Sequence, residues 1–180
     1  ITIGEGAAAF LLSAEPSAVR LLGVGESADA HHMTAPDPQG GGAVAAMTRA
    51  LADAGLGAEA IRYINLHGTG TPLNDAMEAR AIATLFPAGT AVSSTKGLTG
   101  HLLGATGGVE LALLWLALTG RTPSLPAHLW DGIADPALPP LAFVAPGTPV
   151  PDGVCAMLSN SFGFGGSNAT VILGRDQGCT

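Results

Sequence analysis

The chain has 180 residues, of which 47% are hydrophobic and only 12% are charged, and its formal net charge is −7. This length is enough for one domain with a hydrophobic core. The seven basic residues are spread singly along an acidic chain, which argues against binding to a nucleic-acid backbone. The longest apolar helix pattern, residues 109–118, is about half as long as a bilayer requires, so we expect no membrane-spanning segment.

The cysteines and histidines show no pattern typical of a metal site. Cys155 and Cys179 have neither metal nor disulfide spacing, so we expect a reducing cytoplasm. His31 and His32 are adjacent, but neighbours in an extended chain point to opposite sides and no third ligand lies near them.

The first third of the chain predicts two strands and one helix. The apolar runs 1–13 and 21–30 are typical of strands, and the prolines in 31–38 indicate a loop between regular elements. Small apolar residues recur on one face of 42–54, which predicts a packing helix. Gly55 is a suitable residue to end it.

A second strand–helix unit follows. Residues 61–66 form a short apolar strand that runs into a Gly/Thr loop, and Thr71 or Asn74 can cap the next helix. Asp75 and Glu78 match the positive end of that helix dipole. The expected buried stripe of the helix consists of Leu73, Met77, Ala81, Ile82 and Leu85.

The third unit repeats this arrangement. Residues 91–95 are expected to form a strand and residues 96–104 a loop. Thr106 can cap a helix over 107–118, which is apolar nearly all round and is therefore expected to be buried on most sides.

The last third begins with a proline-rich stretch, 120–152, in which we expect one strand at 141–144. Residues 154–159 and 169–173 are expected to form a pair of strands joined by a glycine-rich turn over 160–168. Strands that alternate with helices and end in a hairpin predict an α/β layered domain.

Two strand-to-loop junctions bear the residues best suited to chemistry. Lys96 is the only lysine of the chain and lies among hydroxyls and glycines, with His101 close behind it. His67 follows the preceding strand in a similar loop. A single histidine at a strand end is more often structural than catalytic. Two of them together with the only lysine indicate one shared site at the strand ends.

Five segments of the chain resemble the β-ketoacyl synthases, the condensing enzymes of fatty-acid and polyketide assembly, and in particular the elongating, type II-like enzymes. The matching segments are GEGAA (4–8), TAPDP (34–38), NLHGTGTPLNDAMEARAI (65–82), SSTKGLTGHLLGATGGVE (93–110) and SNSFGFGGSNA (159–169). They occur in the family's order and span nearly the whole chain. The resemblance implies that residues 1–180 form the C-terminal half of a thiolase-like α/β fold, with a mixed sheet flanked by helices and an αβαβα layering in the complete enzyme.

The resemblance also implies roles for individual residues. His67 and His101 match the two histidines of a cysteine–histidine–histidine triad, and Lys96 with its acidic companion Glu110 matches the pair that supports the site. The residues implied in substrate binding are Thr69, Thr71, Phe162, Phe164 and Thr34. From the residues alone, Glu110 can also be a helix-start carboxylate favoured by the dipole, but that reading is less sufficient because an unpaired carboxylate is costly to bury in an almost uncharged helix. Thr69, Thr71 and Phe164 remain equally cap and packing residues.

The implied reaction is a decarboxylative Claisen condensation of an acyl thioester with malonyl-acyl carrier protein, in fatty-acid or polyketide synthesis. The family's nucleophilic cysteine lies in the N-terminal half, and neither Cys155 nor Cys179 matches it. We therefore expect this chain to be inactive without an N-terminal half. The implied partners are acyl carrier protein, that N-terminal half and a second subunit in a homodimer or heterodimer. No cofactor is implied beyond the phosphopantetheine of the carrier protein.

Two other readings stay open. A subunit related to chain-length factors keeps the fold, lacks the nucleophile and pairs with an active partner. The presence of His67, His101 and Lys96 favours the enzyme. A thiolase is disfavoured because thiolases generally have a second cysteine in place of one of these histidines.

Overall fold

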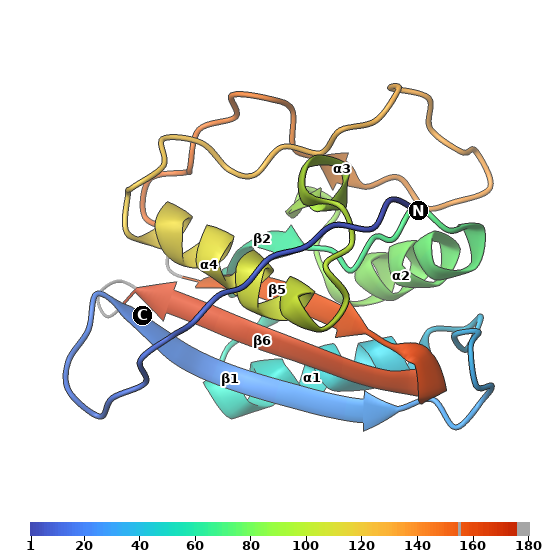
Figure 1. Ribbon diagram of the computed structural model, residues 1–180, viewed down its shortest axis with the longest axis horizontal. Coiled ribbons are helices and arrows are strands. Elements are labelled where there is room, and N and C mark those ends of the chain that lie inside the picture. Colours follow the sequence, from blue (N-terminus) through green and yellow to red (C-terminus); the bar gives the residue numbers. More distant parts are fainter. Residues whose placement is uncertain (155, 176–180) are drawn as a thin grey trace.

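Residues 1–154 and 156–175 are described in the computed structural model, and their strands form one six-stranded sheet with helices on both faces (Figure 1). The strands are β1 (Val19–Ala28), β2 (Ile61–Asn65), β3 (Ala91–Ser93), β4 (Ala142–Phe143), β5 (Ala156–Phe162) and β6 (Ser167–Arg175). The helices are α1 (Gly41–Ala54), α2 (Pro72–Leu85), α3 (Lys96–Thr99) and α4 (Thr106–Leu118), with short 3-10 turns at Ala58–Ala60, Leu103–Ala105 and Phe164–Gly166.

The sheet is mixed, with the strand order β1-β6-β5-β2-β3-β4. Strands β5, β2, β3 and β4 run parallel, whereas β6 is antiparallel to both of its neighbours, β5 and β1. The carboxyl ends of β2, β3 and β5 therefore meet at one edge of the sheet. Ligand sites in α/β sheets are built at that kind of edge, from the loops that follow the strands.

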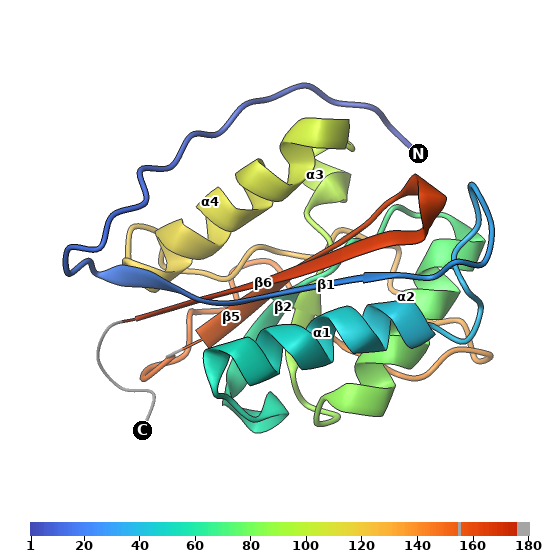
Figure 2. The ribbon, with the colours of Figure 1, turned by 90° about the horizontal axis from the view of Figure 1, so that it is seen from below.

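Two layers of helices bury the two faces of the sheet. Figure 2 shows α1 and α2 on one face and α4 on the other. Each layer has its own hydrophobic cluster: Met47, Ile64, Met77 and Leu158 belong to the first, and Tyr63, Leu114, Leu118 and Met157 to the second. Neighbouring residues such as Ile64 and Tyr63 belong to opposite clusters because successive side chains of a strand point to opposite faces.

Helix α1 lies unusually close to the edge strand β1. A Cβ atom on Gly25 would lie 2.0 Å from the carbonyl oxygen of Ala46, and one on Gly23 would lie 2.3 Å from that of Ala50. Glycines in the strand and alanines in the helix therefore allow the two backbones to pack in near contact.

The expected strand at residues 1–13 is wrong. Only Ile3 forms a bridge, to His101, supported by hydrogen bonds from Gly4 N–H to the His101 carbonyl (3.0 Å) and from His101 N–H to the Thr2 carbonyl (2.8 Å). Beyond Gly4 the segment crosses over α4 (Figures 1 and 2). A helix cannot serve as a strand partner, because its interior backbone groups are already hydrogen-bonded to one another.

The predicted start of α2 needs three corrections. Leu73, expected in the buried stripe, is 63% exposed, and the stripe instead includes Asn74 and Glu78. Thr71 lies at the N-cap position without making a side-chain cap bond, because its hydroxyl is 2.9 Å from that of Thr69. Glu78 is buried and binds the backbone of the preceding loop rather than only favouring the helix dipole.

The remaining elements differ from expectation mainly at their ends. The region 96–104 contains the short helix α3, and the turn between the last two strands is shorter than expected, because β5 continues to Phe162 and β6 begins at Ser167. Thr106 starts α4 but makes no cap bond. One stripe of α4 is fully buried and the rest is half-buried.

The expectations about Cys155 and Cys179 lie outside the described residues. Within the described ranges, no helix has both the length and the apolar character needed to cross a membrane.

Candidate active site

His67 lies two residues beyond β2, in a loop that a buried carboxylate holds in place. The backbone N–H groups of His67 and Gly68 each donate to a different oxygen of Glu78 on α2, both at 2.8 Å. The side-chain amide of Asn160, on β5, donates to the same carboxylate at 3.3 Å. Burial raises the pKa of Glu78 to about 7, against the lowering effect of these hydrogen bonds. The loop after β2 is thereby tied to both α2 and β5.

His101 follows α3 with its tautomer set by its neighbours. Its Nδ1 accepts the backbone N–H of Leu103 at 3.2 Å and lies 3.1 Å from the hydroxyl of Thr106. A backbone N–H can only donate, so Nδ1 is the acceptor and the proton of the neutral ring sits on Nε2. Partial burial, followed by the charge of Lys96, lowers the pKa of His101. The ring is therefore a neutral Nε2–H donor.

The two histidines meet as expected. Their ring centroids are 5.7 Å apart with the planes at 84°, and the ring of Phe162, at the end of β5, lies 5.8 Å from that of His67. His67 is only 8% exposed, and burial, Lys96 and His101 together lower its pKa to about 3. The predicted convergence of the two loops is confirmed, and both rings are neutral near pH 7.

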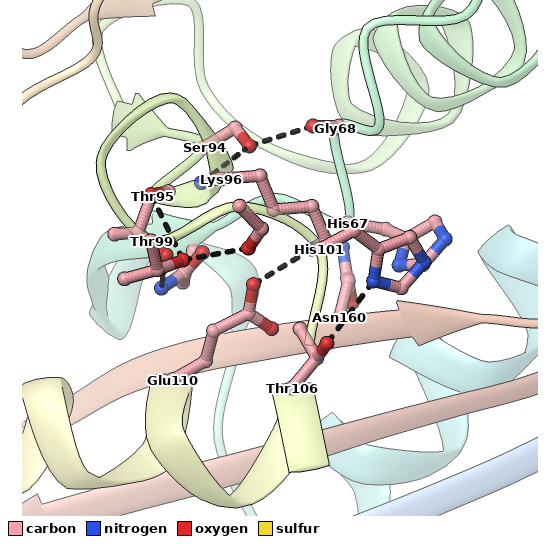
Figure 3. A network of polar contacts seen from close by, with 12 residues as sticks. His67, Gly68, Ser94, Thr95, Lys96, Thr99, His101, Thr106, Glu110 and Asn160 are labelled. Carbon is pink, nitrogen blue, oxygen red and sulfur yellow. Dashed lines mark hydrogen bonds and ion pairs between the residues drawn. The ribbon is translucent and has the colours of Figure 1, made fainter. Parts of the chain in front are cut away.

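Lys96 and Glu110 form a buried ion pair beside the histidines. Nζ of Lys96 lies 2.7 Å from Oε1 of Glu110, and the two side chains are 5% and 2% exposed. Burial raises the pKa of Glu110 to about 7, although the adjacent ammonium lowers it. The other oxygen of Glu110 has no hydrogen-bond partner among the described residues. Figure 3 shows Glu110 reaching from α4 toward Lys96, with Thr106 pointing to His101 from the start of the same helix.

Ser94 joins the two loops. Its hydroxyl donates to the carbonyl of Gly68 at 2.6 Å and accepts the backbone N–H of Lys96 at 3.3 Å (Figure 3). The loop of His67 and the loop of Lys96 are therefore one hydrogen-bonded unit.

A cavity of about 1010 Å³ opens beside this unit. Lys96, Gly68 and Thr69 line it together with residues 128–130, 133–136 and 138–141, whereas His67 and His101 do not. The space is therefore next to the histidine pair rather than around it.

The other predicted substrate-binding residues occupy two kinds of position. Phe162 is 7% exposed and packs on His67, and Thr69 and Thr71 are half-buried with their hydroxyls paired. Phe164 is 82% exposed and Thr34 is also exposed, so the structure leaves both on the surface. Their loops are joined by a hydrogen bond from Gly165 N–H to the Met33 carbonyl at 2.7 Å.

Sequence reasoning missed the supporting roles of Glu78, Asn160 and Ser94. A signal for Glu78 was present: it falls in the helical stripe with Asn74, Met77, Ala81 and Ile82, where a carboxylate must be buried. No comparable local pattern marks Asn160 or Ser94.

Comparison with known proteins agrees with this geometry. The family model of the β-ketoacyl synthase C-terminal domain matches residues 18–129. The chain belongs to the β-ketoacyl synthase family. This ketosynthase chain is 46% identical over 186 residues to a mitochondrial 3-oxoacyl-[acyl-carrier-protein] synthase of Arabidopsis thaliana, covering 95% of the chain and 39% of that relative. It is 40% identical over 186 residues to 3-oxoacyl-[acyl-carrier-protein] synthase 2 of Coxiella burnetii, covering 96% of the chain and 44% of the relative. It thus spans less than half the length of either relative.

Solved ketosynthase structures share the fold. A ketosynthase (ApeO) from Xenorhabdus doucetiae, determined in complex with its chain length factor (ApeC), superposes with a TM-score of 0.84 at 50% identity, over 89% of the chain and 40% of the matched structure. A type II polyketide ketosynthase, bound to the hexaketide and in complex with its acyl-carrier protein, has a TM-score of 0.79 at 25% identity, over 88% and 39%. The predicted thiolase-like α/β fold is confirmed.

Proposed function

We propose that this chain contributes the two-histidine half of a ketosynthase active site, which catalyses decarboxylative condensation of an acyl thioester with malonyl-acyl carrier protein. The observation that supports it most is the pair His67 and His101, two neutral rings with centroids 5.7 Å apart. The proton on Nε2 of His101 makes that ring a donor, which is what a developing oxyanion requires.

In the proposed reaction the bond between the malonyl α-carbon and its carboxylate breaks, CO₂ leaves, and the electron pair moves into an enolate of the carrier thioester. N–H donors from the histidines stabilise the enolate oxygen. The enolate carbon then attacks the acyl carbonyl, and the cysteine leaves as a thiolate. A neutral imidazole suits this role, because it can donate without losing its proton to the enolate.

The nucleophilic cysteine is proposed to come from an N-terminal half outside this chain, and the substrates from phosphopantetheine on acyl carrier protein, with no further cofactor. A second subunit, identical or related, and a cytoplasmic location complete the proposal. Among the related structures, one ketosynthase is bound to its acyl-carrier protein and another to its chain length factor. The reading as a chain-length-factor-like subunit is not favoured, because the buried Lys96–Glu110 pair and both histidines are kept.

The test separates two half-reactions in the complete ketosynthase. His67→Ala and His101→Ala are each expected to slow CO₂ release from malonyl carrier protein by about 10²-fold or more, by analogy with oxyanion-hole deletions. Transfer of a radiolabelled acyl group to the cysteine should be retained. His31→Ala, at an exposed histidine, is the matched control and should leave both steps unchanged. Equal loss of both steps in both variants would show that the histidines act on the cysteine itself, contrary to the proposal.

The chain on its own is proposed to be inactive, because a thiolate nucleophile is required. Adding the N-terminal half should restore condensation. Acylation of Cys155 or Cys179 in the isolated chain, detected by mass spectrometry, would contradict this part of the proposal.

A further inference from the structure

His128 lies in the proline-rich stretch after α4, far in sequence from both histidine loops. Its ring stacks on that of Phe143 in β4, with centroids 4.3 Å apart and planes at 14°, and lies 6.0 Å from the ring of Trp130. Its backbone N–H donates to the carbonyl of Val144 at 2.8 Å. The contacts with Phe143 and Val144 therefore hold His128 against the β4 side of the sheet.

The other side of the imidazole contacts the active-site loops. Nδ1 of His128 accepts the backbone N–H of Ser94 at 3.1 Å. Ser94 is only 6% exposed and follows β3 directly. The hydroxyl of the same serine joins Gly68, next to His67, to Lys96. One hydrogen bond thus connects His128 to the residue that holds both loops together.

That hydrogen bond needs one particular form of the ring. Because the Ser94 N–H can only donate, Nδ1 of His128 has to be unprotonated. A cationic ring would present a second N–H to the Ser94 N–H, and the buried amide would lose its partner. A buried N–H without a partner is unfavourable, so the turn after β3 would have to shift.

We propose that His128 is a positioning residue for the condensation reaction: its neutral imidazole accepts from Ser94 and thereby holds the loops of His67 and Lys96 in register. The expected effect of His128 on the reaction rate rests on the proposed function. Its expected effect on the order of the loops does not. His128 acts through Ser94 and does not touch the reacting atoms.

The charged surroundings of His128 bear on its protonation. Asp75 and Glu78 from α2, Lys96 from α3 and Asp135 from the stretch after α4 line the same cavity as the imidazole. Partial burial lowers the pKa of His128, and this outweighs Asp75, which raises it. The ring is thus neutral and able to accept the hydrogen bond near neutral pH. In acid it becomes protonated and loses this acceptor.

Two substitutions distinguish the effect of the Nδ1 acceptor of His128 from that of its stacked aromatic ring. His128→Phe keeps an aromatic ring to stack on Phe143 and removes the acceptor, whereas His128→Asn places an amide oxygen near the position of Nδ1 but cannot titrate. In the complete ketosynthase, hydrogen–deuterium exchange of peptides covering residues 91–100 should be about tenfold faster in His128→Phe and close to the wild-type rate in His128→Asn.

The kinetic readout is CO₂ release as a function of pH. His128→Phe should lower kcat by about tenfold with KM changed less than about twofold, because a displaced loop misplaces donors without removing substrate contacts. His128→Asn should restore kcat and also flatten the fall in rate at acid pH that His128 causes in the wild type.

Wild-type exchange at residues 91–100, corrected for the intrinsic pH dependence, should rise in acid, and in His128→Asn it should not. This comparison applies even if His128→Phe does not fold, and even if the reaction proves to be a different one. The proposal would be overturned if His128→Phe had the same exchange and reaction rates as the wild type. It would also be overturned if His128→Asn behaved like His128→Phe.

Discussion

Nζ of Lys96 lies 2.7 Å from Oε1 of Glu110, and hardly any of either side chain reaches solvent. The two residues come from different helices, α3 and α4, and are 14 positions apart. A buried charge is costly unless it is paired. The pair is therefore more sensitive to the loss of one partner than to the replacement of both.

Glu110→Ala is expected to lower the free energy of unfolding by about 3–5 kcal/mol, because it leaves the Lys96 ammonium buried without a partner. The double variant Lys96→Met/Glu110→Leu should cost much less, since no uncompensated charge remains. Urea unfolding of the wild type, Lys96→Met, Glu110→Leu and the double variant gives the coupling between the two residues. A double variant as unstable as Glu110→Ala would contradict this expectation.

The buried His67 should make the protein less stable in acid. Its pKa is lowered to about 3 in the folded chain, from 6.5 in the reference state. Its contribution is thus fully present above pH 6.5 and is lost as the pH falls, by about 1.4 kcal/mol per unit. The difference in unfolding free energy between the wild type and His67→Phe should fall with that slope below pH 6.5. A difference that does not change with pH would mean that His67 titrates normally.

The contribution of Glu78 to stability should depend on pH in the opposite direction to that of His67. Burial raises its pKa from 4.5 to about 7, so its contribution is full below pH 4.5 and is lost as the pH rises to about 7. The unfolding free-energy difference between the wild type and Glu78→Gln should be larger at pH 4.5 than at pH 8 by about 3 kcal/mol. Glu26→Gln, at an exposed position of β1, is the matched control for the loss of a carboxyl group. Equal trends in the two variants would rule out the assignment to Glu78.

The loop after His67 contains two glycines that should respond differently to substitution. Both have positive φ angles, 36° for Gly68 and 72° for Gly70. A Cβ on Gly68 would lie 2.6 Å from Cβ of Ser94, whereas one on Gly70 would have no neighbour within 4 Å. Gly70→Ala should cost about 1 kcal/mol of backbone strain, and Gly68→Ala should cost at least about 2 kcal/mol more through the clash. Thermal or urea unfolding distinguishes them, and equal costs would show that Ser94 can move away.

The sequence predicted most elements because their signals are local. The small apolar face of α1 and its end at Gly55, or the apolar run of β5, depend only on residues close together in the chain. The expected strand at 1–13 was wrong because strand formation requires a neighbouring strand as partner, and this segment lies beside the helix α4. An apolar pattern in the sequence does not show whether another strand is available for hydrogen bonding.

The residue types of the candidate site were also determined by the sequence: two histidines and one lysine, each after a predicted strand. Their meeting in space was decided by the parallel order of β5, β2 and β3, which brings the ends of those strands to one edge. Only the tertiary structure decided that His101 has its proton on Nε2 and that Glu78, Ser94 and His128 hold the loops. Protonation and burial depend on partners from distant parts of the chain, and a local pattern of residues does not contain them.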